Sequence, residues 1–592
     1  LRKVLDQLLK AGLLKHRVVL GEDVCSFADI IMRDVVYEEV GTFERKKLHS
    51  SVAATLEKAY AGRIDEHFGE LAYHFLEGGD NDESLGYLLK AGDKAAEIYA
   101  NAEAASYFQS ALRLLEQREG ESQEKGRVLE RLGDVKKLTG EYDDCLKHWN
   151  DALQLCGQLD EKEKASRLHC KMANVLWDKK GEEEKAKEHH DRALKILEAM
   201  PESVELASVY EDVAHMYYRT GDMAKATAWA EKALGLAEKL NAYDVVASSY
   251  ASLGTALAYS GEPKRAVEFL EKGQKIALDH GYMETALRTY NNIPLALTSE
   301  ENQKCLECYE KGLELAKKVG DVYNQSLLGF NLAGMYFNMG NIDKAVLMSN
   351  ETVELDRKTG NIFHLYASTS ALGFAYQVIG EMDRSEQCFK EASRVSRQLN
   401  DFQAIAGGYD YLGLSHFEKG DYVRAKEFFE KLNHTLETAG DKYSQANASQ
   451  YLIWTYIELG ETEKAKSLTD NVFEFVLQVK NKDLIASLTA LKAMLLGREK
   501  KWEESINCFE SSLQEFEALK ARRWGPYFFA KMGLYEYARV YLDRNQEGDR
   551  EKAGKLLSQA LELFQKMGAK RDIERVEAGI AFIETGKEVS KP

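Results

Sequence analysis

The segment GDYVRAKEFFEKLNHTL, at Gly420–Leu436, recurs in related form along most of the chain. Segments of the same pattern begin at Gly221, Gly261, Gly340 and Gly380. The complete set of these marker glycines is Gly140, Gly181, Gly221, Gly261, Gly340, Gly380, Gly420 and Gly460. They lie 40 or 41 residues apart, except for a double interval of 79 after Gly261, and the pattern continues near Lys500 and at Gly548. Such a fixed period predicts a repeat architecture.

Small and aromatic residues hold fixed places around each marker. A small residue follows the marker by five positions, as at Ala226, Ala266 and Ala425. Another precedes it by seven, at Gly133, Ala214, Gly254, Ala333, Gly373 and Gly413. A large ring comes three positions after that one, at Trp177, Tyr217, Tyr336, Tyr376, His416 and Tyr456. The pattern predicts two helices joined by a turn, in which the glycine ends the first helix and the next residue caps the second. Because one such hairpin cannot bury its own apolar face, we expect stacked hairpins with most of these rings in the core.

Composition limits the class of protein. The chain has 592 residues, only five of them proline, which favours one continuous helical array. The formal net charge of −18 argues against nucleic-acid binding and favours basic or apolar partners. No apolar run approaches the roughly 20 residues that cross a bilayer, and no signal peptide opens the chain. With eight scattered cysteines, we expect a cytoplasmic protein with reduced thiols and no membrane contact. The helical pattern is already present at Leu1, which suggests a piece of a longer protein.

The order of a Leu-Gly pair, an aromatic residue, a turn and two small residues resembles the tetratricopeptide repeat (TPR) family, over about residues 65–585. The resemblance implies an all-α fold, an α–α superhelical solenoid, with helices of about 17 residues and roughly 25 Å. It also implies that the first helix of each repeat lines a concave groove where a partner binds. The residues that it places in this groove are Arg288, Asn291, Asn292, Phe330, Asn331, Phe374, Asp410, Tyr411, Asn447, Gln450 and Trp454.

These groove residues combine amides with large apolar side chains. Amides can hold the backbone of an extended peptide, and Phe374 and Trp454 could each supply more than about 2 kcal/mol as anchors. Pro294 stands inside a predicted first helix, where it removes a backbone hydrogen bond. We therefore expect a kink and an irregular joint near residues 291–302.

The first 60 residues differ from the repeats. Two strand patterns, HRVVL and DVCSF, lie between helical patterns in the order of a winged helix. Arg33–Glu38 and Arg45–His49 resemble the winged-helix-to-repeat junction of signal transduction ATPases with numerous domains (STAND). The expected domains are a winged-helix-like remnant at 1–60, short atypical TPR-like repeats at 61–120, about ten forty-residue repeats at 121–545, and a last repeat helix with a capping helix at 546–592.

The sequence carries no motif for catalysis. It has no phosphate loop, nucleophile elbow, kinase signature or metalloprotease helix. Cys305 and Cys308 form a C-x-x-C, but Cys305 occupies a small position of a helix, which indicates core packing. His189 and His190 point about 100° apart on a helix and cannot both readily serve one metal, so we interpret them as part of a solvated face. We expect no enzymatic activity, no cofactor and no metal.

Two functions follow. The leading hypothesis is a non-catalytic protein- or peptide-binding scaffold, acting as the C-terminal sensor or regulatory arm of a larger STAND-type ATPase, with self-association as a further possibility. The alternative is a small-molecule sensing arm, as in regulators of transcription of this wider family. A closed apolar pocket with converging polar groups would favour the alternative.

Overall fold

The computed structural model describes residues 2–19, 22–118, 120–178, 182–297, 301–339, 341–399, 402–479, 481–519 and 525–585. Among these residues the chain is helical apart from one two-stranded sheet. It divides into two compact units, Leu1–Lys137 with Tyr142–Leu168, and Leu138–Glu141 with His169–Pro592. No helix in the described ranges is both long and apolar enough to cross a membrane. The finer domain boundaries expected from the sequence remain a prediction.

The first unit begins with the predicted small hairpin. It follows the order α1 (Arg2–Lys10), β1 (Leu14–Val19), β2 (Glu22–Phe27), α2 (Ile30–Glu39) and α3 (Thr42–Ala59). The strands are antiparallel, with Leu14 opposite Phe27 and Val19 opposite Glu22. Asp29 caps α2 by accepting a hydrogen bond from the Ile31 backbone. No residue of α2 is buried, so its apolar side chains lie on the surface of this unit.

The rest of the first unit consists of helical hairpins. Its elements are η1 (Ile64–His67), α4 (Phe68–Gly78), α5 (Asn81–Glu97), α6 (Asn101–Leu115), α7 (Ser122–Leu138), α8 (Tyr142–Leu159) and the beginning of α9 (Lys162–Asp178). Trp149 of α8 is fully buried against Gly133 of α7. The unit thus contains the same small-against-large packing that the sequence repeats.

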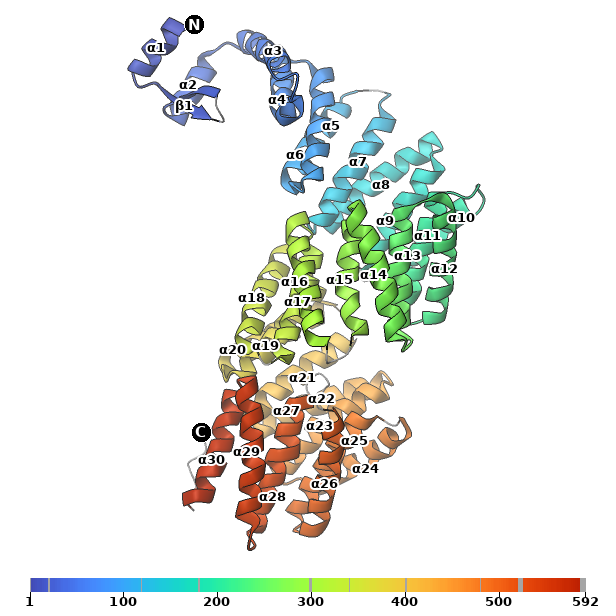
Figure 1. Ribbon diagram of the computed structural model, residues 1–592, viewed down its shortest axis with the longest axis vertical. Coiled ribbons are helices and arrows are strands. Elements are labelled where there is room, and N and C mark those ends of the chain that lie inside the picture. Colours follow the sequence, from blue (N-terminus) through green and yellow to red (C-terminus); the bar gives the residue numbers. More distant parts are fainter. Residues whose placement is uncertain are drawn as a thin grey trace. The chain divides into compact units, whose positions relative to one another are not determined.

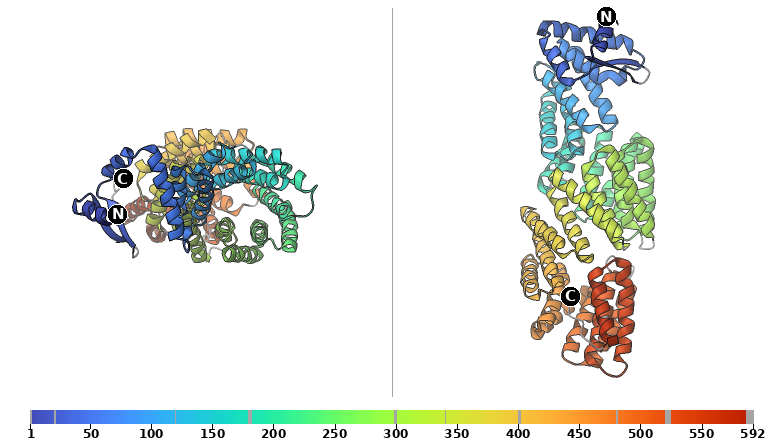
Figure 2. Two further views of the ribbon diagram at one scale, coloured as in Figure 1. Left: turned by 90° about the horizontal axis from the view of Figure 1, so that it is seen from above. Right: turned by 90° about the vertical axis from the view of Figure 1, so that its left-hand side faces the viewer.

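The second unit is a stack of antiparallel helix pairs (Figures 1 and 2). Each helix packs mainly on the helices before and after it in sequence. After the end of α9, its helices are α10 (Glu183–Leu197), α11 (Val204–Arg219), α12 (Met223–Leu240), α13 (Tyr243–Tyr259), α14 (Pro263–His280), α15 (Met283–Ala296), α16 (Asn302–Val319), α17 (Val322–Asn338), α18 (Ile342–Thr359), α19 (Ile362–Val378), α20 (Met382–Leu399), α21 (Phe402–Lys419), α22 (Tyr422–Thr438), α23 (Lys442–Leu459), α24 (Thr462–Val479), α25 (Lys482–Arg498), α26 (Trp502–Leu519), α27 (Gly525–Phe528), the π-helical η3 (Phe529–Tyr535), α28 (Glu536–Arg544), α29 (Asp549–Met567) and α30 (Lys570–Thr585). The predicted all-α solenoid is confirmed.

The marker turns have the predicted chemistry. Gly221 and Gly420 have φ of 84° and 79°, in the left-handed region that favours glycine. Asp222 and Asp421 then cap the following helices by accepting hydrogen bonds from backbone N–H groups three residues on. Lys500, at a marker without glycine, also has a positive φ of 61°. Gly181 and Gly340 lie outside the described residues.

A second series of turns, which the sequence analysis missed, joins each repeat to the next. Gly281, Gly360 and Gly440 have φ of 77°, 68° and 72°. The following helices α19 and α23 are capped by Asn361 and Asp441. The chain therefore turns about every 20 residues, and each repeat carries two similar turns.

Each small residue leaves room for an aromatic ring of the partner helix, which packs directly against the backbone there. A Cβ atom on Gly413 would lie 2.5 Å from the ring of Phe429, and one on Gly373 would lie equally close to Phe389. Both rings are at most 1% exposed. The expectation that the aromatic residues three positions after the small ones lie in the core holds for some of them. Tyr376, His416 and Tyr456 are buried, whereas Trp177, Tyr217 and Tyr336 are half-buried.

One substitution at two glycines should have opposite effects. Gly413→Ala should lower the free energy of unfolding by about 1–3 kcal/mol, because the new methyl group overpacks against Phe429. Gly235→Ala, at an exposed helical site with open space around its Cβ, should raise it by about 0.5–1 kcal/mol through helix propensity. Urea denaturation of both variants measures this. Equal effects at the two sites would contradict the packing described above.

Pro294 ends its helix early. Helix α15 has 14 residues and stops at Ala296, whereas α13 and α17 each have 17. Proline lacks the N–H that would continue the helical ladder. Of the irregular joint expected near residues 291–302, the structure describes the early end of this helix, and residues 298–300 lie outside the described residues.

Candidate ligand-binding cavity

The predicted groove residues fall into two groups. The first group lies on α15 and α17, where several side chains are already engaged with one another. An Arg288 guanidinium N–H lies 2.9 Å from Glu211 Oε1 and 2.7 Å from the Ser248 carbonyl oxygen. The buried Asn292 amide donates to Thr255 Oγ1 at 3.0 Å. These two residues hold neighbouring repeats together, which corrects the expectation that both are available to a partner.

The remaining members of this group are more accessible. Asn331 Nδ2 donates to Asn291 Oδ1 at 2.8 Å, which links amides on successive repeats. Both amides and the ring of Phe330 are half-buried. This part of the structure therefore retains an amide row with an apolar neighbour.

The second group comes together around a cavity of about 610 Å³. Five predicted residues line it, namely Phe374, Asp410, Tyr411, Asn447 and Gln450. Trp454 does not. Its side chain is 3% exposed and packs against Phe417 and Tyr451, with ring centroids 5.1 and 6.2 Å away. The expectation that Trp454 anchors a partner is corrected, because its ring belongs to the core.

Helices on several sides form the cavity walls. The first helices α19, α21 and α23 supply the inner faces of three repeats, with α22, α25 and α26 beside them, and α27 contributes Tyr527 and Phe528. The lining beyond the predicted residues is Gln377, Val378, Ala406, Gly407, Leu414, Glu418, Leu432, Leu436, Tyr443, Ser444, Ala448, Tyr451, Asn481, Leu484, Ser487, Phe516, Tyr527 and Phe528. The wall is thus mainly aromatic and aliphatic, with amides and hydroxyls between.

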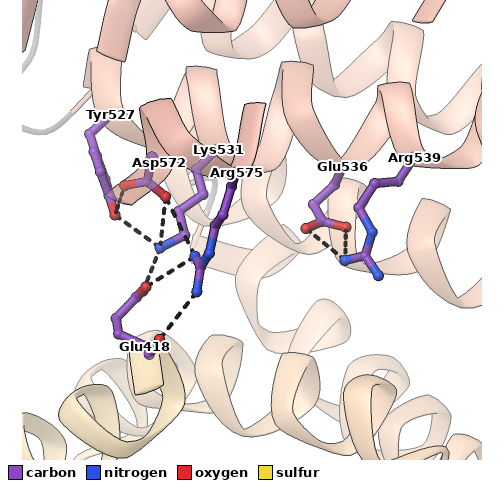
Figure 3. A network of polar contacts seen from close by, with 7 residues as sticks. All are labelled: Glu418, Tyr527, Lys531, Glu536, Arg539, Asp572 and Arg575. Carbon is purple, nitrogen blue, oxygen red and sulfur yellow. Dashed lines mark hydrogen bonds and ion pairs between the residues drawn. The ribbon is translucent and has the colours of Figure 1, made fainter. Parts of the chain in front are cut away.

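A buried ionic cluster, here named the clasp, joins α21 to the C-terminal helices (Figure 3). The clasp consists of Glu418, Tyr527, Lys531, Asp572 and Arg575. Lys531 donates to Glu418 Oε1, and Arg575 lies 3.3 Å from Glu418 Oε2 and donates to the Glu418 carbonyl oxygen at 3.1 Å. Asp572 lies 3.5 Å from Arg575 and accepts from the Tyr527 hydroxyl at 3.1 Å.

The clasp has a consequence for the predicted open groove. Lys531 and Arg575 are 113 and 157 residues beyond Glu418 in sequence. Both nevertheless contact Glu418 near the C-terminal end of α21. The C-terminal helices therefore cover part of the concave wall, and the cavity beneath them stays partly open to solvent. The expectation of a wholly open inner wall is corrected here, because the chain's own helices occupy part of that space.

A π-helical segment places the clasp lysine. In η3 the backbone winds more loosely than in an α-helix, and Lys531 is 3% exposed there among apolar neighbours. Such segments often occur at functional positions. A second ionic group lies nearby, where the half-buried Arg539 pairs with Glu536 at 2.9 Å (Figure 3) and with Glu458 at 3.2 Å. Nothing in the forty-residue pattern indicated either cluster.

Asp410 is the unusual residue of the cavity. It lies two turns before Glu418 on α21, and its carboxylate forms no hydrogen bond or ion pair with any side chain in the described ranges. Its side chain is half-buried in the cavity wall, and this burial raises the pKa of Asp410 to about 7. A carboxylate without a counterion is costly in such a place, which distinguishes Asp410 from the paired Glu418.

Comparison with known proteins agrees with this architecture. The sequence profile of the MalT-like TPR region matches residues 212–519, more than half of the chain. The chain belongs to the MalT-like TPR family. A general tetratricopeptide repeat profile also matches residues 124–199 of this MalT-like TPR protein. No curated protein matches its sequence.

Solved structures include several similar chains. One is the STAND protein with a tetratricopeptide repeat sensor from Pyrococcus horikoshii, with 13% identity and a TM-score of 0.47 over 77% of this chain and 66% of that one, slightly under two thirds of its length. Another is a Rap protein complexed with competence and sporulation factor, with 12% identity and a TM-score of 0.41 over 64% of this chain and 98% of that one. A third is the APC/C hetero-tetramer Cut9–Hcn1, with 14% identity and a TM-score of 0.39 over 85% and 91%.

In the MalT-like TPR protein, His189 and His190 do not both lie on a solvated face, contrary to the prediction from the sequence. His190 is 2% exposed, and His189 Nδ1 lies 2.8 Å from His169 Nδ1. Burial lowers the pKa of His169 to about 4 and also lowers the pKa of His189, so His169 and His189 are neutral at pH 7. The solvated-face interpretation is wrong for His190, because the helix turns that side chain toward the core. Among the described residues, no group of three or more potential ligands could hold a metal ion.

The C-x-x-C thiols lie in the core, as predicted. Cys305 and Cys308 are 6% and 8% exposed, and burial raises the pKa of Cys308 to about 11. Cys25 is exposed on β2. With iodoacetamide at pH 8, Cys25 should therefore be alkylated at least about tenfold faster than either of the pair. Peptide mass mapping of the folded chain measures this, and comparable rates at Cys305 would argue for an accessible redox pair.

Proposed function

We propose that this chain is a non-catalytic, ligand-sensing TPR arm that binds a small molecule in the cavity between α19, α21, α23 and the C-terminal helices. The observation that carries the proposal is that the C-terminal helices, joined to α21 by the clasp, cover part of the groove. An open groove suits an extended peptide, whereas a cavity that is covered on one side limits the length of its occupant. The second of the two functions predicted from the sequence is therefore favoured at this site.

The cavity has the size and lining of small-molecule sites. Such sites usually measure about 300–1,000 Å³ and combine apolar walls with a few well-placed polar groups. Here the cavity measures about 610 Å³, with Phe374, Tyr451 and Phe528 among its rings and Asn447 and Gln450 among its amides. Gln450 Nε2 donates to Asn447 Oδ1 at 2.9 Å, which positions the two amides relative to each other.

The clasp gives a route from ligand binding to a change in structure. Glu418 and Tyr527 both line the cavity and belong to the clasp. A ligand that contacts either residue differs in affinity between a closed and an open clasp, and so it shifts the balance between these states. The moving element would be the C-terminal helices relative to α21.

We also propose that the arm regulates a STAND-type signalling ATPase in the cytoplasm. The support is the resemblance of Arg33–Glu38 and Arg45–His49 to the winged-helix-to-repeat junction of that family, together with the predicted hairpin before them. A nucleotide-binding domain with a phosphate loop in the same polypeptide is the expected finding. A full reading frame without such a domain would contradict this context and leave the cavity proposal intact.

A thermal-shift screen of metabolites tests the sensing function. A ligand at 100 times its dissociation constant should stabilise the folded chain by about 2.7 kcal/mol. Ala448→Trp, which fills the cavity from α23, should abolish the shift of genuine hits. The matched control is Ala439→Trp, at the C-terminal end of α22 and outside the cavity lining. Hits that shift Ala448→Trp as much as the wild type bind elsewhere.

A protein or peptide partner on α15 and α17 is the second candidate. The amide row of Asn291 and Asn331 beside Phe330 favours it, because successive amides can hold an extended backbone. The double variant Phe330→Ala/Asn331→Ala should lose a partner that the wild type captures in pull-down experiments. Retention of that partner by the double variant would exclude this surface.

A further inference from the structure

The charges that line the cavity are unbalanced. Of the described residues that line it, only Asp410 and Glu418 are carboxylic acids, and no Lys, Arg or His is among them. Glu418 is neutralised from behind by Lys531 and Arg575 in the clasp. Asp410 has no such partner among the described residues. The cavity therefore presents one carboxylate whose charge nothing in the described part of the protein offsets.

Aromatic rings surround this part of the cavity. Tyr411 packs edge-to-face against Phe374 with a centroid distance of 5.4 Å, and both rings line the cavity. Tyr451 lines it as well, and its pKa is raised by burial and then by the nearby acids, Asp410 among them. A carboxylate beside aromatic rings is a suitable environment for a cation that has lost its water, since the ring faces attract positive charge.

We propose that the cavity takes an organic cation, an amine or guanidinium joined to an apolar body, whose charge pairs with the carboxylate of Asp410 while the body packs on Phe374, Tyr411 and Tyr451. This inference rests on the proposed ligand-sensing function and names the class of ligand. The cation belongs either to a free amine or to a basic side chain of a short peptide.

The first arm of the test uses three indole probes that differ mainly in charge. Tryptamine is cationic, tryptophol is neutral and indole-3-propionate is anionic. Isothermal titration at pH 7.5 should show tryptamine binding about 10- to 100-fold more tightly than tryptophol, the range for a hydrogen bond to a charged group. Indole-3-propionate should bind least. Equal affinities, or no binding of tryptamine at millimolar concentration, would overturn the inference.

The second arm identifies the source of the cation. An acetylated, amidated Phe-Arg-Phe peptide is compared with its citrulline counterpart, which replaces the guanidinium by a neutral urea of the same shape. A preference for arginine over citrulline that exceeds the preference for tryptamine over tryptophol indicates a peptide side chain as the ligand. The reverse order indicates a free amine. A preference for citrulline, together with equal binding of the indoles, would overturn the proposal.

Two variants test whether Asp410 causes the preference for the cationic probe. Asp410→Asn should reduce the cation preference of the probes to about twofold or less, and circular dichroism checks that it folds. Asp470→Asn, at an exposed site on α24, should leave the preference unchanged. If all indoles bind equally and Ala448→Trp abolishes them, the sensing function stands and the cation inference fails. If the indoles bind Ala448→Trp and the wild type alike, the cavity is not their site, and both the sensing function and the cation inference fail.

Discussion

The Glu418→Gln variant should lose about 3–5 kcal/mol of unfolding free energy in the C-terminal part of the second unit. Removal of one partner from a buried ion pair leaves an uncompensated charge, which is costly in an interior with little water. Here two cations depend on the same carboxylate. Lys531 and Arg575 both contact Glu418, and the side chain of Lys531 is 4% exposed.

The neighbouring acid cannot replace Glu418. Asp572 lies 3.9 Å from Lys531 and 3.5 Å from Arg575, so it can offset one of the two charges but not both. The amide introduced by Glu418→Gln would keep the shape of the side chain and would still accept a hydrogen bond. The expected loss therefore reflects charge rather than a cavity.

Two controls define the measurement. Glu463→Gln removes a carboxylate at an exposed site in the first turn of α24 and should change stability by less than about 0.5 kcal/mol. Lys531→Met leaves Glu418 paired with Arg575 and should cost less than Glu418→Gln. Urea denaturation and hydrogen exchange of the α30 amides report the effect. A loss at Glu418 no larger than that at Glu463 would show that the clasp contributes nothing to stability.

The pH dependence of the stability that the clasp provides follows from the direction in which the pKa of Glu418 is shifted. Burial raises its pKa, but Lys531 and Arg575 outweigh burial and hold the pKa below its ordinary value. A depressed carboxyl pKa stabilises the folded state above the unfolded value of about 4.3, and this contribution disappears as the pH falls through the folded value. The stability difference between wild type and Glu418→Gln should therefore be constant above about pH 5 and shrink below pH 4.

The repeat fold could be predicted from the sequence because its determinants are local. Gly413 and Phe429 are 16 residues apart and belong to one hairpin, and Asp421 caps the helix that it precedes. Each repeat carries a similar set of signals. The family match over residues 212–519 confirms the interpretation. Regularity of this kind survives the loss of single signals, as at Lys500 and Pro294.

The cavity could be predicted only in part. Phe374, Asp410, Tyr411, Asn447 and Gln450 were placed together because their spacing follows the repeat. The cover over part of the cavity depends on contacts between Glu418 and residues more than 100 positions away, for which no period exists. Trp454 was misplaced for a related reason, since its burial depends on the rings of Phe417 and Tyr451 that happen to surround it.

Asp410→Asn should stabilise the chain, although it makes the same chemical change as Glu418→Gln two turns away on α21. Without a ligand, ionised Asp410 faces the cavity with no counterion in the described part of the chain, so its charge opposes folding. The neutral amide removes this cost. At pH 8 the variant should exceed the wild type by about 1–2 kcal/mol in unfolding free energy. Raising a carboxyl pKa from about 4 to about 7 corresponds to roughly 4 kcal/mol, but Asp410 is half-buried and water in the partly open cavity offsets part of this cost.

The pH profile separates this effect from ordinary repacking. The folded pKa of Asp410 is raised to about 7, whereas the unfolded value is about 3.9. The unfolded chain therefore releases this proton first, and the wild type loses stability as the pH rises from about 4 to about 7 and then no further. Urea denaturation of both proteins between pH 5 and pH 9 should show a difference that grows up to about pH 7 and is constant above it. A difference in unfolding free energy that does not vary with pH would mean that the pKa of Asp410 is not raised. A destabilised Asp410→Asn variant would mean that the charge of Asp410 is already balanced in the wild type. Natural sequences keep such costly groups mainly where function requires them, so a stabilising Asp410→Asn that also loses cation binding would identify this carboxylate as a binding group.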